Sequence, residues 1–176
     1  MRKIKLYIAI SLNGKIARTD GSVDWLESMP NPDQTDHGFG KFYSSIDTTL
    51  QGYNTYKVLL DRGIEIPSKD KINFVLTRKQ HVTNTKFITF ITEKHLHFVE
   101  DLKEKEGKDI WLIGGGQVNT MLFNANLIDE MRVFVMPIII PEGISLFESI
   151  PKESRLKLIG SKTYSSGAVE LNYKII

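Results

Sequence analysis

The sequence predicts an α/β protein in which layers of helices cover a mixed, mostly parallel central sheet that is extended by a C-terminal antiparallel hairpin. Strand-like apolar runs alternate along the chain with segments of helical periodicity, which is typical of a parallel sheet between helix layers. The first run, residues 5–12, is continuously apolar at residues 6–10, as expected of a strand covered on both faces. Two later runs, 156–164 and 169–176, flank a Ser-Ser-Gly turn and predict the hairpin.

The remaining elements follow from the same patterns. Residues 48–50, 72–76, 87–91, 110–113 and 131–136 are predicted strands, and residues 95–105 and 118–125 are predicted amphipathic helices. Asn54 is a suitable cap for a further helix that runs through Tyr56 and Leu59. We expect a helix within residues 33–46 and a long loop containing Trp25 over residues 16–32, with residues 1–176 forming a single domain.

Composition narrows the class of protein. The net charge of the 176 residues is +2 and the basic residues are spread along the chain, which argues against nucleic acid as a partner. No apolar run approaches the roughly 20 residues that span a membrane, and the N-terminus lacks the features of a signal peptide. The chain contains no cysteine, which excludes disulfides and thiolate metal sites and fits a reducing compartment. We therefore expect a cytoplasmic protein with no membrane association.

The strongest local signal is the glycine turn at Gly114, Gly115 and Gly116, which is followed by Gln117 and Val118. A buried strand ends there and a helix begins, so that backbone N–H groups and the positive end of the helix dipole face the same crevice. Glycine has no Cβ, and a diphosphate can therefore approach the backbone closely. This context favours a phosphate-bearing dinucleotide, whereas the alternative is a tight turn that simply needs positive φ.

A second polar segment, Leu76, Thr77 and Arg78, follows a predicted strand and is continued by Lys79. Parallel strands end at one edge of a sheet, so this segment is expected on the same edge as the glycine turn. The hydroxyl of Thr77 and the planar fork of Arg78 are suited to a phosphate group. The alternative is a solvated loop charge.

The third candidate site combines Asp36 with the aromatic residues Phe39, Phe42 and Tyr43. On a helix, Asp36 would share a face with Phe39 or Tyr43 near the first strand. A carboxylate among aromatic rings could anchor a substrate or relay a proton with a raised pKa, with Phe39 as a substrate contact. The alternative is that Asp36 stabilises the N-terminus of the helix.

Other catalytic classes find little support in the sequence. The four histidines have no spacing typical of a metal site, and we predict no bound metal. A Ser–His–Asp hydrolase of the α/β type would need a Gly-x-Ser-x-Gly turn, which the chain lacks.

Taken in order, four segments resemble the dihydrofolate reductase-like superfamily, and most closely the C-terminal reductase domain of bacterial riboflavin biosynthesis proteins and its stand-alone relatives. The segments are YIAISLNGKIA at 7–17 with DGSVDWL at 20–26, SIDTTLQGYNTY at 45–56, IGGGQV at 113–118, and PIIIPEGISLF at 137–147. The resemblance implies an α/β/α dihydrofolate reductase-like fold and an NADPH-dependent reductase. The last segment is expected to close the substrate pocket.

The resemblance also assigns roles to individual residues. It implies that the backbones of Ala9 and Ile16 meet the nicotinamide amide and that Trp25 lines the substrate pocket. Asp36 falls where folate enzymes keep the acid that binds the pterin ring. The implied cofactor-binding residues are Ala9, Ile16, Gly52, Tyr53, Asn54, Thr55, Leu76, Thr77, Arg78, Gly114, Gly115, Gly116, Gln117 and Val118.

The chain departs from the family pattern at informative places. Asn13 replaces an aspartate, and Gln51, Gly52 and Tyr53 stand where the pattern is Met-Gly-Arg, so that one expected phosphate partner is missing. Val133 and Val135 offer no hydroxyl where folate reductases place a threonine, which disfavours a folate substrate.

The sequence therefore predicts a reductase that acts on a small heterocyclic or ribosyl substrate, as 5-amino-6-(5-phosphoribosylamino)uracil reductase does. Two alternatives stay open, a dihydrofolate reductase and a non-catalytic nucleotide-binding protein. The resemblance also suggests a homodimer, for which the apolar residues Val133, Val135 and 138–140 offer a surface; the alternative is that they form core.

Overall fold

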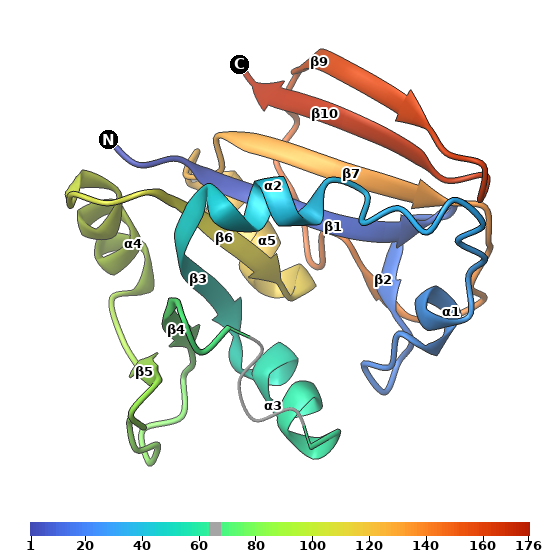
Figure 1. The fold of residues 1–176 in the computed structure, drawn as a ribbon. Coiled ribbons are helices and arrows are strands. Elements are labelled where there is room, and N and C mark those ends of the chain that lie inside the picture. Colours follow the sequence, from blue (N-terminus) through green and yellow to red (C-terminus); the bar gives the residue numbers. More distant parts are fainter. Residues whose placement is uncertain (64–67) are drawn as a thin grey trace.

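The computed structural model describes residues 1–63 and 68–176 and places most strands in one sheet with the order β5-β4-β3-β6-β1-β7-β10-β9 (Figure 1). The pairs from β5 across to β7 are parallel, and β10 runs antiparallel to both β7 and β9. These strands are β1 (Ile4–Ser11), β3 (Ile46–Gly52), β4 (Ile72–Leu76), β5 (Ile88–Ile91), β6 (Asp109–Gly114), β7 (Glu130–Met136), β9 (Leu156–Thr163) and β10 (Val169–Ile175). The predicted mixed, mostly parallel sheet with a C-terminal hairpin is confirmed.

Helices lie on both sides of this sheet (Figure 1). In β1, Leu6 belongs to the large core cluster with Val99 of α4 and Leu122 of α5, whereas Tyr7, which points to the opposite face, stacks on Phe42 of α2. The helices are α1 (Asp24–Glu27), α2 (Phe39–Ser44), α3 (Tyr53–Asp61), α4 (His95–Glu104) and α5 (Gly116–Asn124). This arrangement confirms the predicted layers of helix, sheet and helix.

Several predicted boundaries were wrong. Residues 16–32 are not one loop, because they contain the end of β2 (Lys15–Ala17), which pairs with β8 (Ile144–Ser145), and the short helix α1. The helix expected within residues 33–46 is restricted to Phe39–Ser44, since Gln34, His37 and Gly38 all have positive φ. Positive φ interrupts a right-handed helix, and the sequence pattern does not reveal it at Gln34 and His37.

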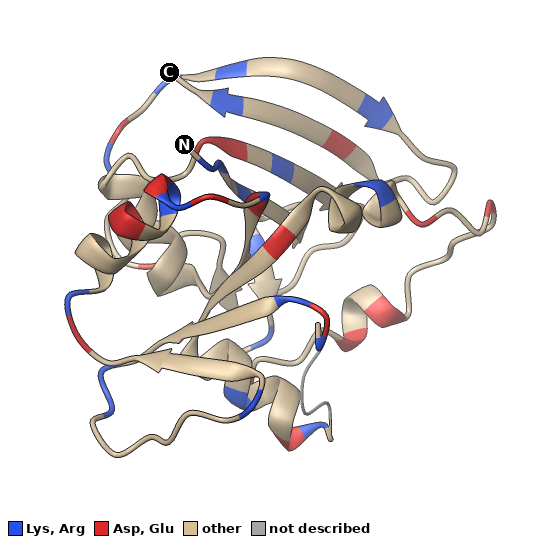
Figure 2. Ribbon diagram, turned by 60° about the vertical axis from the view of Figure 1, so that its left-hand side comes forward, with Lys and Arg blue, Asp and Glu red and all other residues tan. Residues whose placement is uncertain are grey.

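The apolar run proposed as a dimer surface is largely interior. Val133 and Ile140 are buried in the two core clusters, and only Ile139 of residues 138–140 is exposed. The homodimer therefore stays a prediction without the surface first suggested for it. Charged residues are distributed over the whole molecule rather than gathered on one face (Figure 2). In the described part of the chain, no helix has the length and apolar character needed to cross a bilayer.

Candidate functional site

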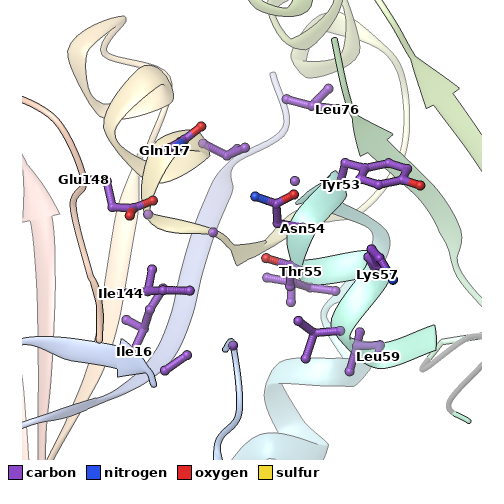
Figure 3. A pocket seen from close by; sticks show the side chains of 18 of the residues that line it. Ile16, Tyr53, Asn54, Thr55, Lys57, Leu59, Leu76, Gln117, Ile144 and Glu148 are labelled. Atoms are coloured by element: carbon purple, nitrogen blue, oxygen red, sulfur yellow. The ribbon is translucent and has the colours of Figure 1, made fainter. Parts of the chain in front are cut away.

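A cavity of about 1090 Å³ opens at the edge of the sheet where the parallel strands end (Figure 3). Its walls come from the ends of β3, β4 and β6, the beginnings of α3 and α5, and the β2–β8 pair. Ligands of open α/β sheets bind at this carboxyl edge. The cavity-lining residues include Tyr7, Ala9, Ile16, Leu26, Gly52, Tyr53, Asn54, Thr55, Leu76, Thr77, Arg78, Lys79, Gly115, Gly116, Gln117, Val118, Ile144 and Glu148.

The glycine turn joins β6 to α5 through backbone conformations that favour glycine. Gly114 has φ +121° and Gly115 has φ +100°, and Gly115 is the residue that caps the N-terminus of α5. Side chains with a Cβ rarely adopt these angles. A Cβ added at Gly115 would lie 3.0 Å from Oγ1 of Thr55, across the cavity edge on α3. The turn therefore needs glycine for its conformation and also keeps its backbone open to the cavity.

Gly116 has a different reason to be glycine. A Cβ there would lie 2.4 Å from the carbonyl oxygen of Ser145 and 2.5 Å from Cγ of Glu148. The backbone N–H of Glu148 donates to the carbonyl of Gly116 at 3.2 Å, which holds the chain after β8 against the turn. The missing side chain at Gly116 thus accommodates a neighbouring segment of the protein.

The end of β4 presents two cations to the cavity. Oγ1 of Thr77 accepts the backbone N–H of Lys79 at 3.1 Å, and Thr77 itself is buried. Arg78 and Lys79 are exposed, and neither forms a salt bridge with any residue that the structure describes. Nζ of Lys79 lies 4.3 Å from the centre of the Tyr53 ring, a distance typical of a cation–π contact. Positive charge at this end of the cavity is therefore available to a ligand.

The beginning of α3 differs from the prediction in its cap. Gly52, with an extended backbone, precedes the helix, and Tyr53 and Asn54 are its first residues, so Asn54 is not the cap. Val118 of α5 packs so closely that a Cβ on Gly52 would lie 3.0 Å from its Cγ2. The two helix N-termini, of α3 and α5, are thereby brought to opposite sides of one cavity (Figure 3).

The other end of the cavity is apolar. Tyr7 and Ala9 of β1 and Leu26 of α1 all pack against the core cluster that contains Trp25, and all three line the cavity. The Tyr7 hydroxyl donates to the backbone carbonyl of His37 at 3.1 Å, and burial raises the pKa of Tyr7 so that it stays neutral. A neutral aromatic wall of this kind suits a flat, uncharged ring.

The profile of the RibD C-terminal domain matches residues 2–169, which is nearly the whole chain. The chain belongs to the RibD C-terminal domain family. The likeness inferred from the sequence segments is thereby confirmed.

Several known proteins resemble the chain over nearly its full length. The uncharacterized protein YwjB of Bacillus subtilis is 36% identical over 172 residues, covering 98% of this chain and 97% of YwjB. A crystal structure of a putative riboflavin biosynthesis protein from Shewanella sp. PV-4 superposes with a TM-score of 0.87 at 26% identity, covering 99% of both chains. Dihydrofolate reductase from Enterococcus faecalis, solved with NADP(H), shares the fold with a TM-score of 0.68 at 18% identity, covering 98% and 96% of the two chains.

Most of the residues predicted for the cofactor surround this one cavity. Of that set, Gly114 is buried within the turn, with φ +121°, and the other members line the cavity walls. Trp25 instead lies in the core with Phe134 and Ile140, only 1% exposed, and its indole N–H has no partner among the described residues. Phe39 packs against Tyr7 and Trp111 behind the cavity wall. The structure therefore places Trp25 in its packed interior and leaves Phe39 half-buried against Tyr7 and Trp111, and neither residue lines the cavity.

Asp36 differs from the prediction in both location and electrostatics. It precedes α2, is exposed, and accepts the backbone N–H groups of Gly38 at 2.8 Å and Gly40 at 3.0 Å. These hydrogen bonds lower the pKa of Asp36, so the expected raised pKa was wrong. A carboxylate at the beginning of a helix is stabilised in this manner, and the geometry matches the alternative of a helix-terminal role.

Sequence reasoning missed several cavity residues. His95 lies with Nε2 3.0 Å from the carbonyl oxygens of Thr77 and of Ile91, which fixes the loop after β4. Ile144 and Glu148 enter from the chain around β8, a two-residue strand too short to leave a pattern. Glu148 directly follows the segment 137–147 that resembles the family's closing segment, and this position was the one available signal.

Proposed function

We propose that the chain is an NADPH-dependent reductase acting on a small heterocyclic or ribosyl substrate, in the manner of 5-amino-6-(5-phosphoribosylamino)uracil reductase. One observation carries the proposal: a single cavity combines a Cβ-free helix N-terminus, two cations that form no salt bridge with any described residue, and a neutral aromatic end. Membership in the RibD C-terminal domain family supports a reductase of this kind.

The cavity fits a dinucleotide in size and chemistry. Its volume of about 1090 Å³ slightly exceeds the roughly 300–1,000 Å³ of ordinary ligand cavities, as a large ligand requires. Gly115 at the N-terminus of α5 would receive the diphosphate, because backbone N–H groups and the helix dipole favour negative charge there. Arg78 and Lys79 would receive the phosphate on the adenosine ribose, and the backbones of Ala9 and Ile16 the nicotinamide amide.

The role of the protein is to orient the nicotinamide and the substrate and to exclude water from the reacting atoms. NADPH, when bound, supplies the hydride, and the chemistry of that transfer belongs to the cofactor. Tyr7 and Leu26 would hold a flat substrate against the nicotinamide end, and their apolar surfaces would keep water from the reacting atoms. Arg78 would distinguish NADPH from NADH, since Tyr53 stands where the family pattern has an arginine.

The two alternatives now differ in support. A folate reductase needs an acid facing the pterin ring, whereas Asp36 is exposed and already accepts hydrogen bonds from Gly38 and Gly40. The presence of Tyr53 where the family pattern has an arginine favours a non-catalytic nucleotide-binding protein. Gln51 is 1% exposed and belongs to the interior, so it does not decide between the readings.

Two measurements test the proposal. NADPH fluorescence titration should show saturable binding, and absorbance of NADPH should fall on addition of an aminopyrimidine-ribityl or aminopyrimidine-ribosyl compound. Dihydrofolate is the control substrate and should give no turnover. If NADPH binds but none of these compounds is turned over, the result would favour the non-catalytic alternative. If NADPH does not bind, the result would contradict both the proposed reductase and a dihydrofolate reductase.

A further inference from the structure

Glu148 is a carboxylate in the cavity wall for which the described protein provides no partner. It lines the cavity and is half-buried, and its side-chain oxygens form no hydrogen bond or ion pair with residues 1–63 or 68–176. A carboxylate is an acceptor only, so an unused one in a cavity requires hydrogen-bond donors from water or a ligand. Donor groups on a bound ligand would meet this requirement.

The position of Glu148 is fixed from two sides. Its Cγ and Cδ lie 2.5 and 3.2 Å from the place where a Cβ of Gly116 would be, directly beside the glycine turn. The strand that precedes it, β8, pairs with β2, so that Ile144 lies next to Ala17 and near Ile16. Figure 3 shows Glu148 on one wall between Gln117 and the pair formed by Ile144 and Ile16.

The residues along this wall follow the same order as the successive parts of a bound dinucleotide. Under the proposed function, on which this inference rests, Ile16 marks the nicotinamide end, and Gly115, the neighbour of Gly116 in the glycine turn, marks the diphosphate. The group that joins a nicotinamide to its phosphate is a ribose, and its hydroxyls are hydrogen-bond donors. Carboxylates bind ribose hydroxyls in other dinucleotide sites. We propose that Glu148 binds the hydroxyls of the nicotinamide ribose and so sets the position of the nicotinamide ring.

The charge distribution agrees with this assignment. A carboxylate facing a diphosphate would repel it, and Glu148 would then weaken binding. The cations Arg78 and Lys79 come from the end of β4, whereas Glu148 follows β8 and lies by Ile144 and Ile16. The cations without an ion partner among the described residues therefore come from the β4 end, and Glu148 offers a hydroxyl acceptor near Ile16; Lys57 and Arg62, which also line the cavity, are paired with Asp61 and Glu27.

Calorimetric titrations of Glu148→Ala and Glu148→Gln with three probes test the proposal. NADPH and NADH both contain the nicotinamide ribose, and adenosine 2′,5′-bisphosphate lacks it. Glu148→Ala should weaken NADPH and NADH equally, by about tenfold, which corresponds to about 1.4 kcal/mol. Glu148→Gln keeps one acceptor oxygen and should lose less. Both variants should bind adenosine 2′,5′-bisphosphate as the unmodified protein does.

Glu142→Gln is the matched control, because Glu142 is an exposed acid of the same segment outside the cavity lining. Thermal melting verifies that each variant is folded, and Glu148→Gln preserves the side-chain shape if Glu148→Ala does not fold. Unchanged or tighter NADPH binding by the folded variants would overturn the assignment, as would an equal loss for adenosine 2′,5′-bisphosphate. If the unmodified protein binds NADPH, such a result leaves the proposed function standing; if it binds no dinucleotide, both proposals fail.

Discussion

Charged residues at the two ends of the parallel strands differ in whether they form ion pairs within the protein. At the amino ends of β1, β3, β6 and β7, charges are paired: Arg2 with Asp47, Lys3 with Glu130, and Lys5 with Asp109. At the carboxyl ends, the cavity wall on α3 contains the exposed pair Lys57 and Asp61, but Arg78, Lys79 and Glu148 line the same cavity without an ion partner in the described chain.

The difference separates charges that hold the fold from charges available to a ligand. Arg2 is 7% exposed, and it donates to the Asp47 carboxylate and to Oγ1 of Thr48 at 2.6 Å. The backbone N–H of Lys108 also donates to Asp47, at 2.8 Å, and closes this network. Changes at the amino edge should therefore alter stability and spare binding, and changes at the carboxyl edge should do the reverse.

The largest expected effect is at the glycine turn. Gly115→Val should abolish dinucleotide binding, with a loss above about 100-fold, or about 2.7 kcal/mol. The new Cβ would meet Oγ1 of Thr55 at 3.0 Å, and φ +100° is unfavourable for valine. NADPH titration measures the loss, and circular dichroism should stay close to that of the unmodified protein.

Gly167→Val is the matched control for backbone strain. Gly167 has φ +83° in the hairpin turn, and a Cβ there would lie 3.1 Å from Cγ of Pro137, outside the cavity. This variant should lose stability and keep NADPH affinity. Retained binding by Gly115→Val would mean that the glycines serve the turn alone.

At the opposite edge, Arg2→Met should cost about 2 kcal/mol of unfolding free energy, because it leaves the Asp47 carboxylate without its main partner. Urea denaturation measures this loss, and NADPH affinity should not change. Lys3→Met is the control at the same edge, since Lys3 is 52% exposed and exposed pairs contribute under about 1 kcal/mol. A binding defect in folded Arg2→Met would contradict the division between the two edges.

Arg78→Ala should weaken NADPH about tenfold and leave NADH nearly unchanged. A charge-assisted hydrogen bond contributes about 1.5–3 kcal/mol, and solvent screening of the exposed Arg78 brings the value to the lower limit. Parallel titrations with both cofactors give the ratio. Equal losses would show that Arg78 does not contact the 2′-phosphate, and an unmodified protein without preference would show that Tyr53 marks a loss of NADPH specificity.

The smallest expected effect is at Asp36. Asp36→Asn should lower stability slightly, because asparagine is a weaker acceptor for the N–H groups of Gly38 and Gly40, and NADPH affinity should be unchanged. The native pKa is lowered from 3.8, so the carboxylate stabilises the fold fully above that pH and loses its contribution as pH falls through the native pKa. Urea denaturation at pH 7 and pH 3 should therefore show the difference shrinking in acid. Reduced turnover in Asp36→Asn at unchanged stability would restore the substrate role first predicted.

Much of the fold could be predicted because its strands bury continuous apolar runs. The apolar runs at residues 6–10 of β1 and 110–113 of β6 predict a parallel sheet that is covered on both faces. The glycine turn predicts the edge of the sheet at which the cavity lies. The start of α2 could not be placed, because the positive φ of His37 and Gly38 leaves no sequence pattern, and the hydrogen bond from Arg132 to the His37 carbonyl at 2.9 Å joins residues distant in sequence.

Some residues of the candidate site could also be predicted from the sequence, and others could not. Residues at the end of β4, such as Leu76 and Thr77, could be placed because parallel strands share an edge, and Val118 because it follows the glycine turn into α5. Trp25 could not, because an aromatic residue in a polar segment suits a pocket or a core equally, and tertiary packing against Phe134 decides it. Glu148 was missed since its neighbour β8 is two residues long and its pairing with β2 is visible only in three dimensions.

Hydrogen exchange of the unmodified protein with and without NADPH tests the contrast between the two edges most directly. NADPH is expected to slow exchange of the backbone amides at residues 115–118, 77–79 and 144–149. Amides at the amino edge, residues 2–5, 46–48 and 108–110, should exchange at unchanged rates. Protection at the amino edge, or none at the glycine turn under saturating NADPH, would contradict this contrast.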